Sequence, residues 1–481
     1  MPQTSWTAAL SAARGLDVYV EESRRRTLRW DDGRLDESSD ASDAGIGLRR
    51  LGESSRFASL EARRPLTEGL TAEEARQCVA RAKFLAPSPL RGGRAGWGGS
   101  GETPPIPGYP PPRSFDRASR ECREGATPSK GEDEKPHSLE TKLKWLARAE
   151  KAARSDRRVR QVHLTLGELS KKIAGLSPEG RSYADRRDYA TFVVQVTAED
   201  GKMRQSGYEV VAVQGGWEAL AATDPALLAR RSAKRALEKL AAPPAPLGEM
   251  AVVIAAEAGG TLIHEAVGHS LEADHILDGS SPHFAHRVGK RVAGDKISVL
   301  DDPTRPGQRG SFSFDDEGTP AERTVLIENG ILRTYLYDRR SAKRGERPSN
   351  GHGRRESYAH PPIPRMSNTF IAPGPDDPQK IRRELKRGLY VTRLGGGQVN
   401  TATGDFVFEV EEGYWVENGQ IRHPVRGANL LGNGPEVLRT IDRVGWDLGW
   451  SVGTCGKDGQ NVPVSDGLPT LRIPRVVVGG A

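Results

Sequence analysis

A stretch of 51 residues, 87–137, limits more than any other feature how this chain can fold. It contains ten Pro and nine Gly, set among Ser, Arg and Glu. Such a composition buries too little apolar surface to offset the cost of ordering the backbone, about 1–2 kcal/mol per residue. We therefore predict that 87–137 is a disordered insertion in the first domain. A solvated insertion is preferred to the alternative, a polyproline ligand for an aromatic groove.

The length and composition are those of an ordinary globular protein. With 481 residues the chain is long enough for two packed domains. Its net charge of +7 is too diluted among 28% charged residues to indicate nucleic-acid binding. Apolar runs are no longer than a strand and the N-terminus lacks a secretory pattern, so we expect no membrane span and a cytoplasmic protein. Three scattered Cys residues are too few for a disulfide framework.

The first half alternates strand signals with helix signals. Asp32-Gly33 lies between two strand-like runs and is typical of a tight hairpin, because both turn residues must tolerate positive φ. Asp200-Gly201 predicts a second hairpin. Helices are predicted at 71–85, after the N-cap Ser138, and from 225 to about 240 after the N-cap Asp224. The apolar face expected for the helix after Ser138 consists of Leu139, Leu143, Leu146 and Ala147.

A Pro-rich run at 243–246 marks a domain boundary near residue 245. Beyond it, turn signals at Asn329-Gly330 and Asn418-Gly419 separate strand-like runs. The predicted fold class is α+β with two domains. Residues 1–245 form an N-terminal α/β domain with an antiparallel sheet and helices. Residues 246–481 form a C-terminal, β-rich, barrel-like domain that carries the helix described next.

Chemistry concentrates in a helix-length segment, 261–277, which contains His264, Glu265 and His269. Two imidazoles and a carboxylate are the materials of a zinc site in which His residues bind the metal and Glu takes a proton from water. Histidines five residues apart lie about 140° apart around an ideal α-helix, so they cannot both reach one ion. Because Gly268 tolerates local distortion, we predict a π-bulge or kink at 267–269. The residues alone leave open two buried, hydrogen-bonded histidines without metal.

Four motifs follow this segment along the chain. They are Arg354-Arg355-Glu356-Ser357-Tyr358, Pro361-Pro362-Ile363-Pro364-Arg365-Met366, Gly395-Gly396-Gly397-Gln398-Val399-Asn400-Thr401 and Gly453-Thr454-Cys455-Gly456-Lys457-Asp458-Gly459. In this order, and together with 264–275, they resemble the TldD family of metalloproteases, within the TldD/PmbA group. The resemblance covers almost all of 250–475 and extends more loosely to a strand at 45–49.

The resemblance implies that His264, His269 and Cys455 bind one zinc ion per chain. It also implies that Glu265 is the catalytic base. Three protein ligands leave the fourth position of a tetrahedral ion to water, which is the arrangement of a catalytic rather than a structural site.

Other residues near these motifs have open roles. Glu272, Asp274 and His275 could supply a ligand or a hydrogen bond to the metal-binding histidines, and capping or surface roles are equally open. The segment 395–400 is either a flat strand edge, to which an extended peptide could add, or a tight turn before a strand.

We therefore expect a zinc-dependent metallopeptidase that hydrolyses short or unfolded peptides. The resemblance further implies a hetero-oligomer with a related subunit of the PmbA (TldE) type that lacks the zinc motif. Two alternatives remain: a metal-dependent amidohydrolase acting on small molecules, and a non-enzymatic scaffold subunit. The intact set of three ligands and Glu265 argues against a scaffold, which has no need of all four.

Overall fold

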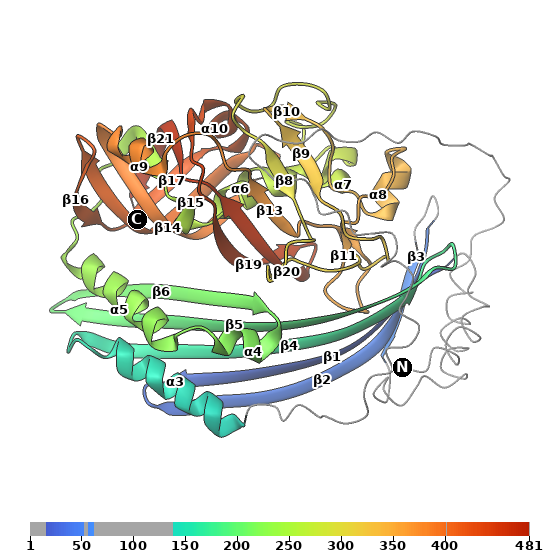
Figure 1. The fold of residues 1–481 in the computed structure, drawn as a ribbon, viewed down its shortest axis with the longest axis horizontal. Helices are drawn as coiled ribbons and strands as arrows, with labels where there is room; N and C mark the ends of the chain where they lie inside the picture. The colour runs from blue at the N-terminus through green and yellow to red at the C-terminus, as the bar shows by residue number, and fades with distance from the viewer. Residues whose placement is uncertain (1–15, 52–55, 62–137, 401, 481) are drawn as a thin grey trace.

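The computed structural model describes residues 16–51, 56–61, 138–400 and 402–480. Its first half contains a six-stranded antiparallel sheet in the order β3-β2-β1-β4-β5-β6, with three helices packed against one face (Figure 1). The strands are β1 (Asp17–Asp31), β2 (Arg34–Arg50), β3 (Arg56–Glu61), β4 (Val159–Leu176), β5 (Ser182–Asp200) and β6 (Met203–Gln214). The helices are α3 (Leu139–Ala153), α4 (Gly216–Ala221) and α5 (Pro225–Ala241).

Both predicted hairpins of this sheet are present. Asp32 and Gly33 join β1 to β2 with φ values of 42° and 90°, in the left-handed region that Asp and Gly enter at low cost. Gly201, with φ of 59°, lies in the turn between β5 and β6. The local chemistry of these turns therefore sets the register of the strands that they connect.

The predicted starts of α3 and α5 are also confirmed. The Ser138 side chain accepts a hydrogen bond from the backbone N–H of Thr141 at 3.3 Å. The Asp224 side chain accepts one from the N–H of Ala226 at 3.1 Å. Each side chain thus satisfies one of the N–H groups that a helix start leaves unpaired.

The apolar face predicted for α3 is wrong for two of its four residues, while Leu146 is buried and Leu143 is half-buried. Leu139 is 49% exposed and Ala147 also faces solvent, whereas Trp145 and Ala149 are buried with Leu146 against the sheet. The Trp145 ring packs edge-on against Phe192 of β5, with ring centroids 4.5 Å apart. An aromatic side chain removes 150–250 Å² from water, so burial of Trp145 decides the rotation of the helix.

The second half contains a closed five-stranded barrel in the order β14-β7-β21-β17-β15, which closes because β15 also pairs with β14. The predicted β-rich, barrel-like fold is therefore confirmed. The barrel strands, with β16 and β18 attached to them, are β7 (Gly248–Ile254), β14 (Arg387–Val399), β15 (Asp405–Glu417), β16 (Gln420–Val425), β17 (Ala428–Asn433), β18 (Arg443–Val444) and β21 (Leu471–Gly480). The Asn418-Gly419 turn joins β15 to β16, as predicted.

A second six-stranded sheet lies beside the barrel in the order β10-β9-β8-β13-β20-β19. Its strands are β8 (Val299–Asp301), β9 (Thr324–Glu328), β10 (Ile331–Leu332), β13 (Asn368–Ile371), β19 (Gly449–Lys457) and β20 (Gln460–Leu468). A small pair consists of β11 (Gly353–Arg354) and β12 (Ile363–Pro364), and three short helices are α8 (Arg339–Arg344), α9 (Pro378–Arg383) and α10 (Gly434–Thr440). Asn329-Gly330 forms the predicted turn between β9 and β10.

The long strands of the first sheet reach the second half of the chain. They continue beyond α3 and α5, as Figure 1 shows. There, Arg187 of β5 forms a buried ion pair with Asp316 at 2.8 Å, and Arg49 of β2 forms one with Glu317. The two halves are thus joined through buried charges, and the division near residue 245 stays a prediction.

Two predicted segments, the helix at 71–85 and the insertion at 87–137, lie outside the described residues. Within the described ranges, no helix is both long enough and apolar enough to cross a membrane.

Candidate metal centre

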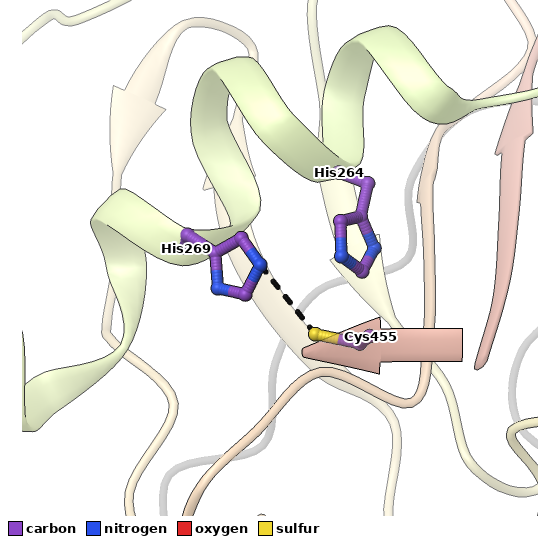
Figure 2. A group of neighbouring side chains, drawn as sticks. All are labelled: His264, His269 and Cys455. Carbon is purple, nitrogen blue, oxygen red and sulfur yellow. Dashed lines mark hydrogen bonds between the residues drawn. The ribbon is translucent and has the colours of Figure 1, made fainter. Parts of the chain in front are cut away.

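The segment that carries both histidines changes its helical geometry twice. It runs from the short helix α6 (Thr261–Ile263) through a π turn, η5 (His264–Gly268), into a 3₁₀ turn, η6 (His269–Leu271). The backbone N–H of His269 donates to the carbonyl of His264, which is the i to i+5 bond of a π turn. This bond turns the two imidazoles to the same side (Figure 2), with ring centroids 4.9 Å apart. The predicted distortion is confirmed.

The helical segment is not continuous to residue 277. Glu272 is extended, with φ of −74° and ψ of 126°, and separates η6 from α7 (Ala273–Leu277). The cause is a strand-like bridge between Glu272 and Leu336, with the N–H of Ala273 bonded to the Leu336 carbonyl at 2.9 Å. Tertiary pairing thus overrides the local helical pattern.

Gly268 serves the π turn in a different way from the one predicted. Its φ and ψ are both −55°, which any residue adopts in a helix. A Cβ atom at this position would, however, overlap the sulfur of Met366. Gly268 therefore supplies space for Met366 rather than conformational freedom.

Cys455 approaches the histidines from β19 (Figure 2). Its Sγ atom lies 3.4 Å from Nε2 of His269, and the ligand atoms of His264, His269 and Cys455 all lie within 4.8 Å of one another. The ligands of a tetrahedral zinc ion lie about 3.4–3.6 Å apart, given Zn–S of about 2.3 Å and Zn–N of about 2.05 Å. The structure thus brings together the three predicted ligands in a donor set that fits zinc.

A carboxylate orients each imidazole. The Nδ1 atom of His264 lies 2.7 Å from Oδ1 of Asp466, and Nδ1 of His269 lies 3.0 Å from Oε2 of Glu272. When each Nδ1–H donates to its carboxylate, each Nε2 keeps its lone pair for a metal. Glu272 thus takes the hydrogen-bonding role left open for it, whereas neither Asp274 nor His275 reaches the two histidines.

Asp466 is a site residue that the sequence motifs do not identify. It lies on β20, 202 positions after His264, and β20 pairs with β19. The only local signal is a polar pair, Ser465-Asp466, directly after the apolar run at 462–464. Its role follows from the pairing of β19 with β20 and not from any spacing along the chain.

The electrostatics of the cluster favour a thiolate beside positively charged imidazoles. Burial opposes ionisation of Cys455, but the two imidazoles hold the pKa of its thiol well below the usual value. Burial likewise opposes protonation of His269, whereas Glu272 and Cys455 raise its pKa to about 10. Burial also opposes protonation of His264, whose pKa Asp466 and Cys455 raise. A divalent cation that displaces the imidazole protons provides the same charge balance.

Glu265 lies in the π turn, directly after His264, and is partly exposed. Burial raises the pKa of its carboxyl, and the two neighbouring imidazoles oppose this rise. Within the described residues, no hydrogen bond or ion pair engages its side chain. The carboxylate is therefore free to accept a proton.

A second group of possible ligands consists of Glu272, Asp274 and His275, whose ligand atoms also lie within 4.8 Å of one another. The ammonium of Lys457 lies 3.0 Å from Glu272 and 2.7 Å from Asp274. Lys457 thus already supplies the positive charge that a metal ion would bring to these two carboxylates.

The Gly-rich segment at 395–399 is part of strand β14, so the alternative of a tight turn is wrong. β14 pairs with β7 over 388–391 and with β15 as far as Val399. In the described part of the chain, the β7 side of 392–399 has no strand partner. A strand edge is therefore present at this position.

Comparison with known proteins gives matches over both halves of the chain. Family models of the PmbA/TldA metallopeptidase match in three parts: domain 1 at residues 16–86, the central domain at 132–240 and the C-terminal domain at 247–480.

Individual relatives agree with these models. A metalloprotease TldD homolog of Haemophilus influenzae is 33% identical over 483 residues, which cover 96% of this chain and 92% of that protein. A zinc metalloprotease TldD homolog of Saccharolobus solfataricus is 32% identical over 305 residues, or 63% of this chain and 68% of that protein. The crystal structure of TldE from Thermococcus kodakarensis has a TM-score of 0.68 at 18% identity and covers 97% of this chain and 96% of that chain, a likeness of fold.

Proposed function

The chain belongs to the PmbA/TldD family of metallopeptidases, and from that premise we propose that it binds one zinc ion through His264, His269 and Cys455. Glu265 is the general base in this proposal. The observation that supports it best is the convergence of one thiol and two imidazoles from β19 and the π turn, with each Nδ1 held by a buried carboxylate.

The chemistry divides between the metal and the side chains. Zinc, when bound, lowers the pKa of water and polarises the carbonyl of the scissile bond. Asp466 and Glu272 keep the two imidazoles aimed at the ion, and three protein ligands leave a position open for the reacting groups. Glu265 accepts the proton of the attacking water on its free carboxylate and delivers it to the leaving amine.

The proposed substrates are short or unfolded peptides bound in an extended form. The free edge of β14 at 392–399 offers main-chain hydrogen bonds to such a peptide, and β14 also contacts the π turn η5. Main-chain recognition suits low sequence specificity, because every residue of a peptide offers the same N–H and C=O groups.

We also propose a hetero-oligomer with a related, TldE-type subunit that lacks the zinc motif, and a cytoplasmic location. The likeness to TldE supports a partner of the same architecture. Activity is therefore to be measured with such a subunit present as well as with the chain alone.

Metal content tests the ligand set. Plasma mass spectrometry should find about one zinc per chain in the wild type and little in Cys455→Ser or His269→Ala. His423→Ala, which changes a half-buried histidine of β16, is the control and should retain the metal. Zinc content that is unaffected by Cys455→Ser would remove Cys455 from the site.

Glu265→Gln tests the base. This variant should keep its zinc and lose peptide hydrolysis by a factor of at least about 100, as expected when a general base is removed. Glu257→Gln, which changes an exposed glutamate just before α6, is the control. Substantial peptide hydrolysis by Glu265→Gln would exclude Glu265 as the base.

A series of peptides of increasing length distinguishes a peptidase from a small-molecule amidohydrolase. A zinc-loaded protein without any hydrolysis would favour a scaffold.

A further inference from the structure

We propose that Lys457 is a positioning residue of the metal centre, acting through Glu272 and through strand β19. This inference rests on the zinc site proposed above. It assigns a function to a lysine that has no direct part in the ligand set or in proton transfer.

The ammonium of Lys457 is fully engaged. Its Nζ atom lies 3.0 Å from Oε2 of Glu272 and 2.7 Å from Oδ1 of Asp274, and it donates to the carbonyl of Pro364 at 3.1 Å. A lysine ammonium has three N–H donors, and three acceptors are present. The side chain is 4% exposed. With no donor to spare for a substrate, Lys457 acts on the arrangement of its neighbours.

The first neighbour is Glu272, the carboxylate that orients His269. One oxygen of this carboxylate, Oε2, makes both contacts: it lies 3.0 Å from Nδ1 of His269 and 3.0 Å from the ammonium of Lys457. The Glu272 side chain is fully buried, and its other oxygen, Oε1, has no hydrogen-bond partner among the described residues. A buried carboxylate is costly unless it is paired, so the ammonium is what makes this orienting group stable beside His269.

The second neighbour is the strand itself. Lys457 lies two residues after Cys455, so both side chains project from the same face of β19. Its contacts with Asp274 at the start of α7 and with Pro364 of β12 fix the end of β19 against the segment that follows the histidines. The position of the thiolate relative to the two imidazoles therefore depends on this three-way contact.

Zinc affinity and the geometry of the site test this role separately from stability. Lys457→Met should weaken zinc binding 10- to 100-fold in competition with a chelating dye, the range seen when groups that orient metal ligands are lost. Lys142→Met is the matched control, because Lys142 is also buried and paired with a single glutamate, Glu168, but joins α3 to β4. It should bind zinc within about twofold of the wild type even where its melting temperature falls.

Cobalt substitution provides a spectroscopic reading of the same comparison. Replacement of Lys457 should change the absorption bands of the cobalt–thiolate centre, and replacement of Lys142 should leave them as in the wild type. If Lys457→Met does not fold, Lys457→Gln, which keeps hydrogen-bond donors without the charge, takes its place.

A double-mutant cycle identifies the route of the effect. In a Glu272→Gln background, Lys457→Met should weaken zinc binding by less than about threefold, because the route through the Glu272 carboxylate is gone and only the contacts of Lys457 with Asp274 and Pro364 are left to lose. Equal losses in both backgrounds would overturn the route through Glu272, and an unchanged affinity and cobalt spectrum in Lys457→Met would overturn the proposal altogether. If zinc binding is itself indifferent to Cys455→Ser, the zinc site fails instead, and the two failures are thus distinct.

Discussion

The Nδ1 atom of His264 lies 2.7 Å from Oδ1 of Asp466, although the two residues are 202 positions apart in the chain. The approach depends on Gly260, which precedes α6. A Cβ atom at Gly260 would overlap the backbone at Asp466 and Gly467. The start of the metal-site segment is thus pressed directly against β20, and this contact positions the first imidazole.

Asp466→Asn should lower zinc affinity by a factor of about 10–100, because a neutral amide replaces the carboxylate that accepts the Nδ1–H of His264. A competition titration with a chelating dye measures the change. The control is Asp458→Asn in the exposed turn between β19 and β20, where φ of 50° suits Asn as well as Asp. Equal affinities for the two variants would show that Asp466 does not orient the ligand.

Gly268→Ala should destabilise the protein by about 1–3 kcal/mol and weaken zinc binding, because the added methyl group displaces Met366 from the π turn. Urea unfolding and the zinc titration measure the two effects. Gly396→Ala is the control, since a Cβ atom there meets no atom within 4 Å. A Gly268→Ala variant as stable as this control would mean that Met366 moves aside freely.

Short-range features of this protein are predictable from the sequence. Ser138 and Asp224 cap helices because their oxygens reach N–H groups within three residues, and Asp32-Gly33 forms a hairpin because both residues accept positive φ. The π turn is predictable for a similar reason, since two histidines five residues apart can serve one predicted metal site only if the helix between them is distorted. In each of these cases the cause lies within a few residues of the effect.

Features that depend on distant partners could not be predicted. The rotation of α3 depends on which surface the sheet presents to Trp145, and the use of Gly268 depends on Met366, which lies far along the chain. Asp466 reaches His264 only because β20 is brought beside α6. These contacts leave no trace in the spacing of residues along the chain. The three candidate ligands could therefore be predicted from the sequence, whereas Asp466, one of the two carboxylates that hold the histidines, could not.

Arg49→Met should cost about 3–5 kcal/mol of stability, because it leaves the buried carboxylates of Asp17 and Glu317 without their shared partner. Thermal or urea unfolding measures the loss. Arg24→Met is the control: Arg24 pairs with Asp40 on the surface, where a salt bridge contributes about 0–1 kcal/mol. Similar losses in both variants would show that the pairing between the two halves contributes little to stability.

Stability should fall with rising pH through the titration of Asp338. Burial, together with Glu317, raises the pKa of this carboxyl from 3.8 to about 6, with Arg49 opposing. Between these two values the folded state holds a proton that the unfolded state has released. The contribution of protonated Asp338 to the free energy of unfolding is therefore complete below about pH 3.8 and is lost as the pH rises to about 6. The loss is on the order of 3 kcal/mol, at about 1.4 kcal/mol for each tenfold change in acidity.

Asp338→Asn removes this pH dependence and keeps the N-cap of α8, since an amide oxygen can also accept from the N–H of Ser341. The free energy of unfolding, measured at pH 4, 5, 6 and 7, should increase for the variant relative to the wild type as the pH rises. Asp377→Asn, at the exposed N-cap of α9, controls for exchange of the cap alone. If the free energies of unfolding of wild type and Asp338→Asn differ by the same amount at every pH in this range, the buried carboxyl of Asp338 does not titrate as predicted.

The length of β5 is set in part by the other half of the chain. This strand of 19 residues packs under the helices at one end, while at the other Tyr183 and Arg187 bond to Asp316. Because side chains alternate between the two faces of a strand, inserting or deleting one residue in its middle would turn both of them away from Asp316. The register of β5 is therefore fixed at both ends, by the residues that it buries under the helices and by the loop at Asp316.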